Sequence, residues 1–200
     1  MYKLKEYVCK NNRQLDTKIA TTLCVALSLL STSPQAAAED GTISFTGSVS
    51  SVTCIVTGGT EETVGSNNFT VPLKTVSTTA LSAAGQHAQA TKFHIALSGV
   101  DCTDGALANV SFERARGTID ETTGNLINTA AAGSAARNVQ IRILNKDTAP
   151  LNLSLPNDRH QEQVIASNTA RFDYWAEYIA TGVAGAGNVE SSLVYSIVYN

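Results

Sequence analysis

Charged residues are scarce in this chain of 200 amino acids. They make up 16% of it, against about 25% in typical soluble domains. Methionine and tryptophan occur once each, so the composition indicates no large cofactor pocket lined by aromatic side chains. The three histidines, His87, His94 and His160, lack the spacing of metal ligands. The sequence therefore predicts no bound metal and no cofactor.

A hydrophobic run of membrane-spanning length is also missing. The apolar stretch at 19–30 is shorter than the roughly 20 residues that cross a bilayer, which disfavours an uncleaved membrane anchor. It follows a segment rich in lysine and precedes a run of small residues, with Ala36 and Ala38 in the A-x-A positions. This order is typical of a secretory signal peptide, so we expect residues 1–38 to be removed on export.

Loss of this segment would change both the charge and the cysteine count. It holds five of the 14 basic and two of the 17 acidic residues, so 9 basic and 15 acidic residues remain, a net charge of −6. No basic cluster is left, which argues against a nucleic-acid partner. Only Cys54 and Cys102 remain of the four cysteines. In an exported protein, one remaining pair predicts one disulfide.

Catalytic constellations are absent from the sequence as well. The acids Asp120 and Glu121 are neighbours, and neighbours on a strand point to opposite faces. The glycine-rich stretch 184–188 lacks the strand–helix context of a phosphate-binding loop. We therefore expect a binding or structural protein and not an enzyme.

Short stretches of alternating apolar and polar residues dominate what is present. They predict about eight or nine strands separated by turn-forming residues, with one helical turn at most, in 77–90. This pattern is typical of a one-domain all-β sandwich with Greek-key connections. The alternation predicts that His94 faces solvent, and it leaves Trp175 either as an exposed contact residue or packed under a loop. The principal strands are expected at 52–56, 69–76, 91–102, 106–115, 138–145, 170–181 and 191–200, with a loop at 57–68.

The two ends of the expected mature chain share an unusual feature. Within the segment 39–50, the residues from 41 onward alternate: one face carries Gly41, Ile43, Phe45, Gly47 and Val49, and the other face carries only hydroxyl residues. Gly47 offers no side chain, which indicates a position where another surface comes close.

The last strand, 191–200, is apolar on both faces and carries no charge. Its alternating set consists of Leu193, Tyr195, Ile197 and Tyr199. An exposed hydrophobic strand edge promotes aggregation, so this end needs another chain to cover it.

Together these features resemble the structural subunits of chaperone–usher fimbriae, the type 1-like pilins. The resemblance is carried by the extension before Cys54, the stretches 71–102, 138–145 and 170–182, the penultimate Tyr199, and Gly187, the fourteenth residue from the end. It implies an incomplete immunoglobulin-like Greek-key sandwich that is completed by donor-strand exchange. The implied organisation is a signal peptide at 1–38, a donor strand at 39–50 and a pilin domain at 51–200.

The resemblance also implies partners and a location. A periplasmic chaperone lends a strand to the groove beside the C-terminal strand, which Gly187, Leu193, Tyr195, Ile197 and Tyr199 help to form. At the outer-membrane usher, the donor segment of the next subunit replaces the chaperone strand, a form of β-strand addition. The chain would then be a subunit of a surface fimbrium that supports cell adhesion.

Three functional interpretations follow from the sequence. The favoured one is a shaft subunit, because the chain carries both a donor segment and a groove-forming end. A minor adaptor pilin remains open. The alternative from another class is a freestanding secreted β-sandwich that binds carbohydrate, in which the strand at 39–50 would fold back on its own sheet.

Overall fold

The computed structural model describes residues 44, 46, 47, 49, 51–114, 117–156, 158 and 161–200. The chain divides into two units, Met1–Thr46 and Gly47–Asn200. In the first unit the described residues, 44 and 46, are exposed and lie in no strand or helix. Among all described residues, no helix has the length and apolar character needed to cross a membrane.

Part of the sequence interpretation falls outside these residues. The expected signal peptide at 1–38 lies there, as do Ile43 and Phe45 of the expected donor segment.

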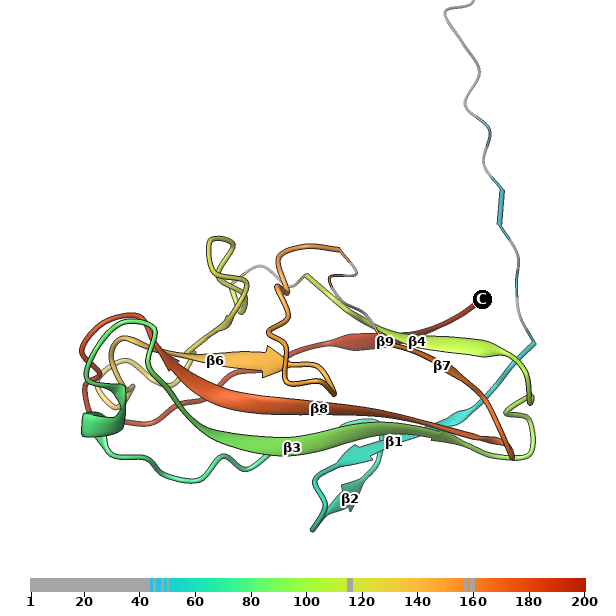
Figure 1. Ribbon diagram of the computed structural model, residues 1–200, viewed down its shortest axis with the longest axis horizontal. Helices are drawn as coiled ribbons and strands as arrows, with labels where there is room; N and C mark the ends of the chain where they lie inside the picture. Colours follow the sequence, from blue (N-terminus) through green and yellow to red (C-terminus); the bar gives the residue numbers. More distant parts are fainter. Residues whose placement is uncertain are drawn as a thin grey trace, which may run out of the picture. The chain divides into compact units, whose positions relative to one another are not determined.

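The second unit consists of two antiparallel β-sheets and one 3-10 turn, η1 (Thr78–Leu81) (Figure 1). This confirms the prediction of an all-β fold with two sheets. The larger sheet has the strand order β2 (Val64–Gly65), β1 (Ile55–Gly59), β3 (His87–Ser98), β8 (Thr169–Ala180), β6 (Val139–Leu144) and β5 (Leu126–Ile127). The smaller sheet has the order β7 (Glu162–Val164), β4 (Leu107–Phe112) and β9 (Tyr195–Tyr199).

The core lies between the two sheets and depends on the strands β3 and β8. These strands have 12 residues each, and they pair from His87↔Ile179 to Ser98↔Thr169 with one irregularity. Their alternation directs Phe93 and Tyr174 inward, where the two rings stack with centroids 5.5 Å apart. Phe112 of β4 meets Tyr174 edge-on at 5.3 Å, so aromatic packing joins the sheets.

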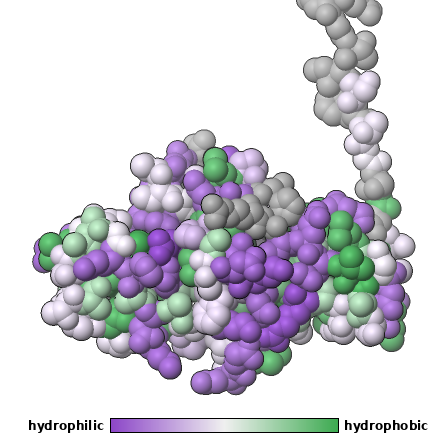
Figure 2. Space-filling view, in the orientation of Figure 1, coloured by the Kyte–Doolittle hydropathy of each residue, from purple (hydrophilic) through white to green (hydrophobic). Residues whose placement is uncertain are grey.

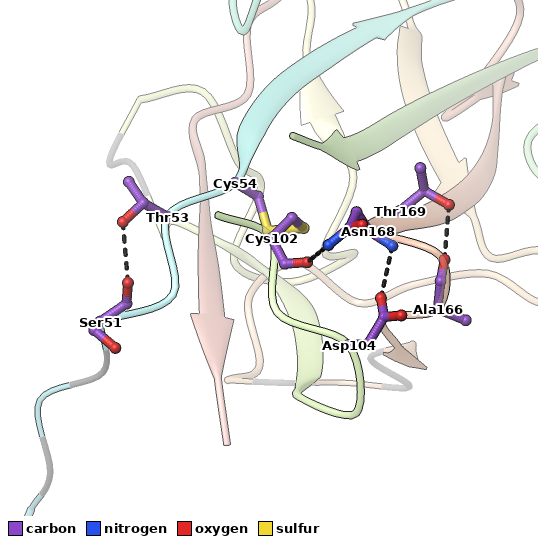
Figure 3. Close-up of a disulfide and its surroundings, with 8 residues drawn as sticks. All are labelled: Ser51, Thr53, Cys54, Cys102, Asp104, Ala166, Asn168 and Thr169. Atoms are coloured by element: carbon purple, nitrogen blue, oxygen red, sulfur yellow. Dashed lines mark hydrogen bonds between the residues drawn. A yellow bond between two sulfur atoms is a disulfide. The ribbon is translucent and has the colours of Figure 1, made fainter. Parts of the chain in front are cut away.

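A disulfide between Cys54 and Cys102 closes one end of the sandwich, as the sequence predicts (Figure 3). The two Cα atoms are 4.5 Å apart, and Cys102 is fully buried. The Asn168 side chain donates a hydrogen bond to the Cys102 carbonyl at 2.9 Å, and the Asn168 N–H donates to Asp104 Oδ1 at 2.6 Å. The disulfide therefore joins the start of β1 to the turn after β3, and Asn168 ties that turn to the start of β8.

Two sequence-based assignments around β1 are wrong. The stretch 57–68, expected to be a loop, contains most of β1 and all of β2, because Gly58 and Gly59 continue the strand into a hairpin. The stretch 69–76, expected to be a strand, lies in no strand. Its alternating residues do pack against the core, so the periodicity reflects burial and not strand pairing.

His94 is also buried, with 5% of its surface exposed, so its assignment to the solvent side is wrong. It does lie on the face opposite Phe93, as the alternation requires. On that face, Glu61 from the turn after β1 forms ion pairs with Lys92 and Arg171, and the turn covers this part of the sheet. Burial lowers the pKa of the His94 imidazole below its ordinary value.

Trp175 lies on the same outer face of the large sheet and is half-buried. Its cross-strand neighbours are Lys92 on β3 and Leu144 on β6. Figure 2 shows that much of the visible surface is polar, with hydrophobic residues gathered toward the right, where β7 and β9 end and β4 begins in Figure 1. The exposed side chains of Val164 and Val198 belong to these strands.

We predict that the disulfide contributes about 4 kcal/mol to the free energy of unfolding, because it restricts an unfolded loop of about 49 residues. Urea unfolding of the chain and of a Cys54→Ala/Cys102→Ala variant measures this difference. Adding a reductant to the unchanged chain should lower its urea midpoint by about as much as the double substitution does. Equal midpoints for all three samples would show that the disulfide does not stabilise the fold.

Candidate functional site

The last strand, β9, has one unpaired edge. It lies at the end of the three-stranded sheet and pairs only with β4, in the register Val110↔Ile197. The Glu113 N–H donates to the Val194 carbonyl, and the Asn200 N–H donates to the Leu107 carbonyl, both at 2.8 Å.

This register decides which backbone groups are free. Antiparallel strands alternate between residues that bond to the neighbouring strand and residues that point away from it. The even-numbered residues from Val194 to Asn200 therefore bond to β4. The N–H and C=O groups of Tyr195, Ile197 and Tyr199 face the free edge, and no described strand meets them.

The side chains of β9 follow the same alternation. Leu193, Tyr195, Ile197 and Tyr199 are half-buried and pack against the core. Val194 and Val198, on the opposite face, are 57% and 40% exposed. Each odd-numbered residue thus combines an inward apolar side chain with unpaired backbone groups.

A groove with a volume of about 690 Å³ lies beside this edge. One wall is formed by Leu193, Tyr195 and Ile197, and the other by residues in the stretch 67–73. The floor comes from core residues of β3, β6 and β8, namely Phe93, Ile95, Ile141, Ile143 and Ala176. The groove therefore opens directly onto the hydrophobic core.

The second wall is unpaired as well. No backbone–backbone hydrogen bond joins any residue of 69–76 to another described residue. Phe69, Val71 and Leu73 nevertheless pack against the core. The groove is thus bordered on both sides by unpaired backbone, with apolar side chains between.

The lining of the groove is uncharged: none of the residues that line it is Asp, Glu, Lys, Arg or His. Its one titratable group is the Tyr195 phenol, and burial raises the pKa of that group. Among the described residues, no cluster of His, Cys, Asp and Glu side chains is arranged to hold a metal ion. What the groove offers is apolar surface together with backbone donors and acceptors, which is what an extended peptide strand requires.

The structure places the residues singled out from the sequence in three different settings. Leu193, Tyr195 and Ile197 line the groove, and Tyr199 follows them on the same face of β9.

Gly187 lies in a separate close approach of two backbones. A Cβ atom at Gly187 would be 2.4 Å from the Ala136 nitrogen, and its φ of +156° disfavours other residues. The next residue, Asn188, hydrogen-bonds to the backbone of Ser134 and Ala136, so Gly187 fixes the chain that leads into the groove wall.

Of the expected donor residues, Gly47 and Val49 are described. Both are exposed and lie in no strand, and Val49 is 102% exposed. A Cβ atom at Gly47 would meet nothing within 4 Å.

The sequence analysis did not identify Phe69 as a residue that lines the groove. It also did not identify Gly58, against which the Phe69 ring packs. A Cβ atom at Gly58 would be 2.2 Å from the Phe69 ring, so the ring lies directly against the backbone of β1. A glycine at an inward position of a strand is a sign of such a close approach.

Comparison with known proteins agrees with this geometry. The family model described as "Fimbrial protein" matches residues 43–200. The major fimbrial subunit SMF-1 of Stenotrophomonas maltophilia is 37% identical over 179 residues, covering 86% of this chain and 100% of that protein. The F17 fimbrial protein of Escherichia coli is 42% identical over 168 residues, covering 81% of this chain and 88% of that protein.

The fold is also found in a solved structure. A chain of a chaperone–usher pilus matches with a TM-score of 0.54 at 13% identity, covering 84% of this chain and 100% of that chain. The family match spans the two sheets, the disulfide and the groove-forming strand. On this evidence, the chain is a fimbrial pilin and belongs to the fimbrial protein family.

Proposed function

We propose that the chain is a structural subunit that polymerises by donor-strand exchange, in which the segment 39–50 of one copy fills the groove of the next. The observation that carries the proposal is the open groove, with unpaired backbone on both walls and the core as its floor. A strand laid along β9 would bond to the free groups of Tyr195, Ile197 and Tyr199. Its inward side chains would complete the core.

The segment 39–50 has the pattern that this groove requires. Ile43, Phe45 and Val49 recur at the strand period of two, on the face that would enter the groove. Each buried side chain contributes roughly 1.5–3 kcal/mol, so the three together would contribute about 4–9 kcal/mol. Backbone hydrogen bonds to β9 would add about 1 kcal/mol each.

The groove also accounts for the proposed export route. Before assembly, unpaired β9 and the apolar floor would be exposed to other unfolded or incomplete chains, and such edges promote aggregation. A periplasmic chaperone that lends a strand would protect them. Exchange at an outer-membrane usher would then place the subunit in a fimbrium on the cell surface, where it supports adhesion.

The freestanding carbohydrate-binding alternative has less support. It requires 39–50 to pair with the sheet of its own chain, whereas Gly47 and Val49 are exposed and lie in no strand. The same segment serves equally well in a shaft subunit and in a minor adaptor. We propose the shaft role because a chain with both a donor segment and a groove can polymerise with copies of itself, and the full-length match to the major fimbrial subunit SMF-1 supports this choice.

We predict that Ile197→Asp prevents the subunit from accumulating in the periplasm, whereas Val198→Asp is tolerated. The first variant places a carboxylate on the groove side of β9 and loses roughly 1.5–3 kcal/mol of apolar burial. The second places the same group on the exposed face, where Val198 is 40% exposed. Immunoblots of periplasmic extracts compare the two, and equal levels would contradict the assignment of the groove face.

We also predict that Phe45→Asp blocks fibre formation without harming the subunit, because the change removes an apolar donor side chain and leaves the groove intact. Thr46→Asp, on the hydroxyl face of the same segment, is the matched control and should assemble. Electron microscopy of the cell surface and heat-sensitive multimers in SDS gels give the readout.

Normal fibres from Phe45→Asp would reject donor-strand exchange by this segment. Loss of the isolated subunit would favour the freestanding alternative.

A further inference from the structure

The two ends of the sandwich are separated by the full length of β3 and β8. The turn 99–104 follows β3 beyond the pair Ser98↔Thr169, and the turn 181–187 follows β8 beyond the pair His87↔Ile179. Strands of 12 residues are about 40 Å long. The two turns therefore lie at opposite ends, as Figure 1 shows. We call the segments 51–55, 98–106 and 162–169 the disulfide end, and the segments 72–90, 128–139 and 180–190 the far end.

The two ends carry opposite charges. The disulfide end has no lysine or arginine, and its acidic residues are Asp101, Asp104 and Glu162. The far end has two basic residues, Lys74 and Arg137, and one acidic residue, Glu190. One end of the sandwich is therefore acidic, and the other has a small excess of basic side chains.

Each end also exposes a valine beside one of these charges. At the disulfide end, Val100 is 92% exposed, and the next residue, Asp101, is exposed as well. At the far end, Val183 is 71% exposed. Backbone contacts hold exposed Arg137 next to it: the Asn138 side chain donates to the Val183 carbonyl at 2.9 Å, and the Gly185 N–H donates to the Arg137 carbonyl at 3.0 Å.

The proposed donor segment leaves the subunit at the disulfide end. The Thr53 N–H donates to the Asp101 carbonyl at 3.3 Å, and the Thr53 hydroxyl donates to the Ser51 carbonyl at 3.1 Å (Figure 3). Ser50, the last residue of the donor segment, precedes Thr53 by three positions, which span at most about 11 Å. A copy that receives the segment 39–50 is therefore held close to the turn that carries Val100 and Asp101.

The charges select which end of the receiving copy lies there. A donor strand antiparallel to β9 would place its Ser50 beside Leu193, next to the far end, where the Thr129 N–H bonds to the Glu190 carbonyl. A parallel donor strand would place Ser50 beside Tyr199, which pairs with Ala108 next to the disulfide end. Two acidic ends would then face each other, and juxtaposed like charges are unfavourable. Opposite charges meet only in the antiparallel arrangement.

We propose that each subunit docks its disulfide end on the far end of the copy that receives its donor segment, with Val100 against Val183 and Asp101 paired with Arg137. This inference rests on the proposed donor-strand exchange and adds a second contact between the same two copies. A contact between two different surfaces repeats without closing, as a fibre requires.

A small contact is sufficient for this purpose. The donor strand already holds the two copies together, so the effective concentration of one end at the other is high. The short linker 51–53 by itself leaves the angle between the two copies free. Docking of the ends fixes this angle and therefore stiffens the fibre.

A charge-reversal cycle in the full chain, produced with its export system, tests the contact. Electron micrographs of sheared fibres at low ionic strength give the persistence length. Asp101→Lys and Arg137→Glu should each shorten it at least about twofold, because an exposed ion pair changes a population by up to about fivefold. The double variant should recover, since the pair is restored with exchanged partners. The matched control is Asp147→Lys, which changes the net charge equally in an exposed turn outside both ends and should leave the fibres unchanged.

Chemical coupling measures the same contact without reversing a charge. Arg137→Lys supplies an amine that a carbodiimide joins to a nearby carboxylate. Treated fibres should then give multimers that survive heating in SDS, above the level of the unchanged chain, and mass spectrometry should locate the link at Asp101. Adding Asp101→Asn should remove this link.

Three results would overturn the docking of the ends. They are equal persistence lengths for Asp101→Lys, Arg137→Glu and Asp147→Lys, a double variant as flexible as the single ones, or coupling of Arg137→Lys only to carboxylates other than Asp101. If a charge-reversed subunit does not accumulate, the coupling result decides. Donor-strand exchange is read separately: unheated multimers should persist in all these variants, because the changes lie outside the groove and the donor segment, and should be lost in Phe45→Asp.

Discussion

The unpaired edge of β9 is the constraint on which the rest of the structure depends. Its odd-numbered residues present free backbone groups, and the same residues direct apolar side chains toward the core. The stretch 69–76 across the groove has the same combination of buried side chains and unpaired backbone. The backbone groups of the two walls cannot pair with each other, because a groove of about 690 Å³ separates them. In the proposed donor-strand exchange, a strand from another molecule would pair with both walls at once.

A sandwich with an open groove needs other sources of stability. The long pair β3–β8 supplies most of the inward aromatic and aliphatic side chains, including Phe93 and Tyr174. The disulfide Cys54–Cys102 restrains the end of the sandwich where β1 begins. Neither β3 nor β8 pairs with β9, so this framework can hold the groove in shape while the groove is empty. Gly58, Phe69 and Tyr195 add a single tie across it.

The sequence predicts the fold well where the alternation of apolar and polar residues coincides with hydrogen-bonded strand pairing. The alternation in 91–102, 138–145 and 170–181 corresponds to β3, β6 and β8, and the last strand is the groove wall that its apolar faces indicate. The periodicity misleads at 69–76 and at His94, because alternation reports burial and not hydrogen-bond partners or the cover given by a neighbouring turn. The contacts of Tyr195 with Asn67 and Phe69 across the groove join residues more than 100 positions apart, and no local pattern encodes them.

Amide hydrogen exchange of β9 tests the central claim most directly. In a subunit whose groove is empty, the amides of Tyr195, Ile197 and Tyr199 should exchange rapidly, while the alternate amides that bond to β4 are protected. In assembled fibres, both sets should be protected, because an added strand pairs with the free edge. Rapid exchange at Tyr195, Ile197 and Tyr199 within intact fibres would show that no strand lies there, and would contradict the account.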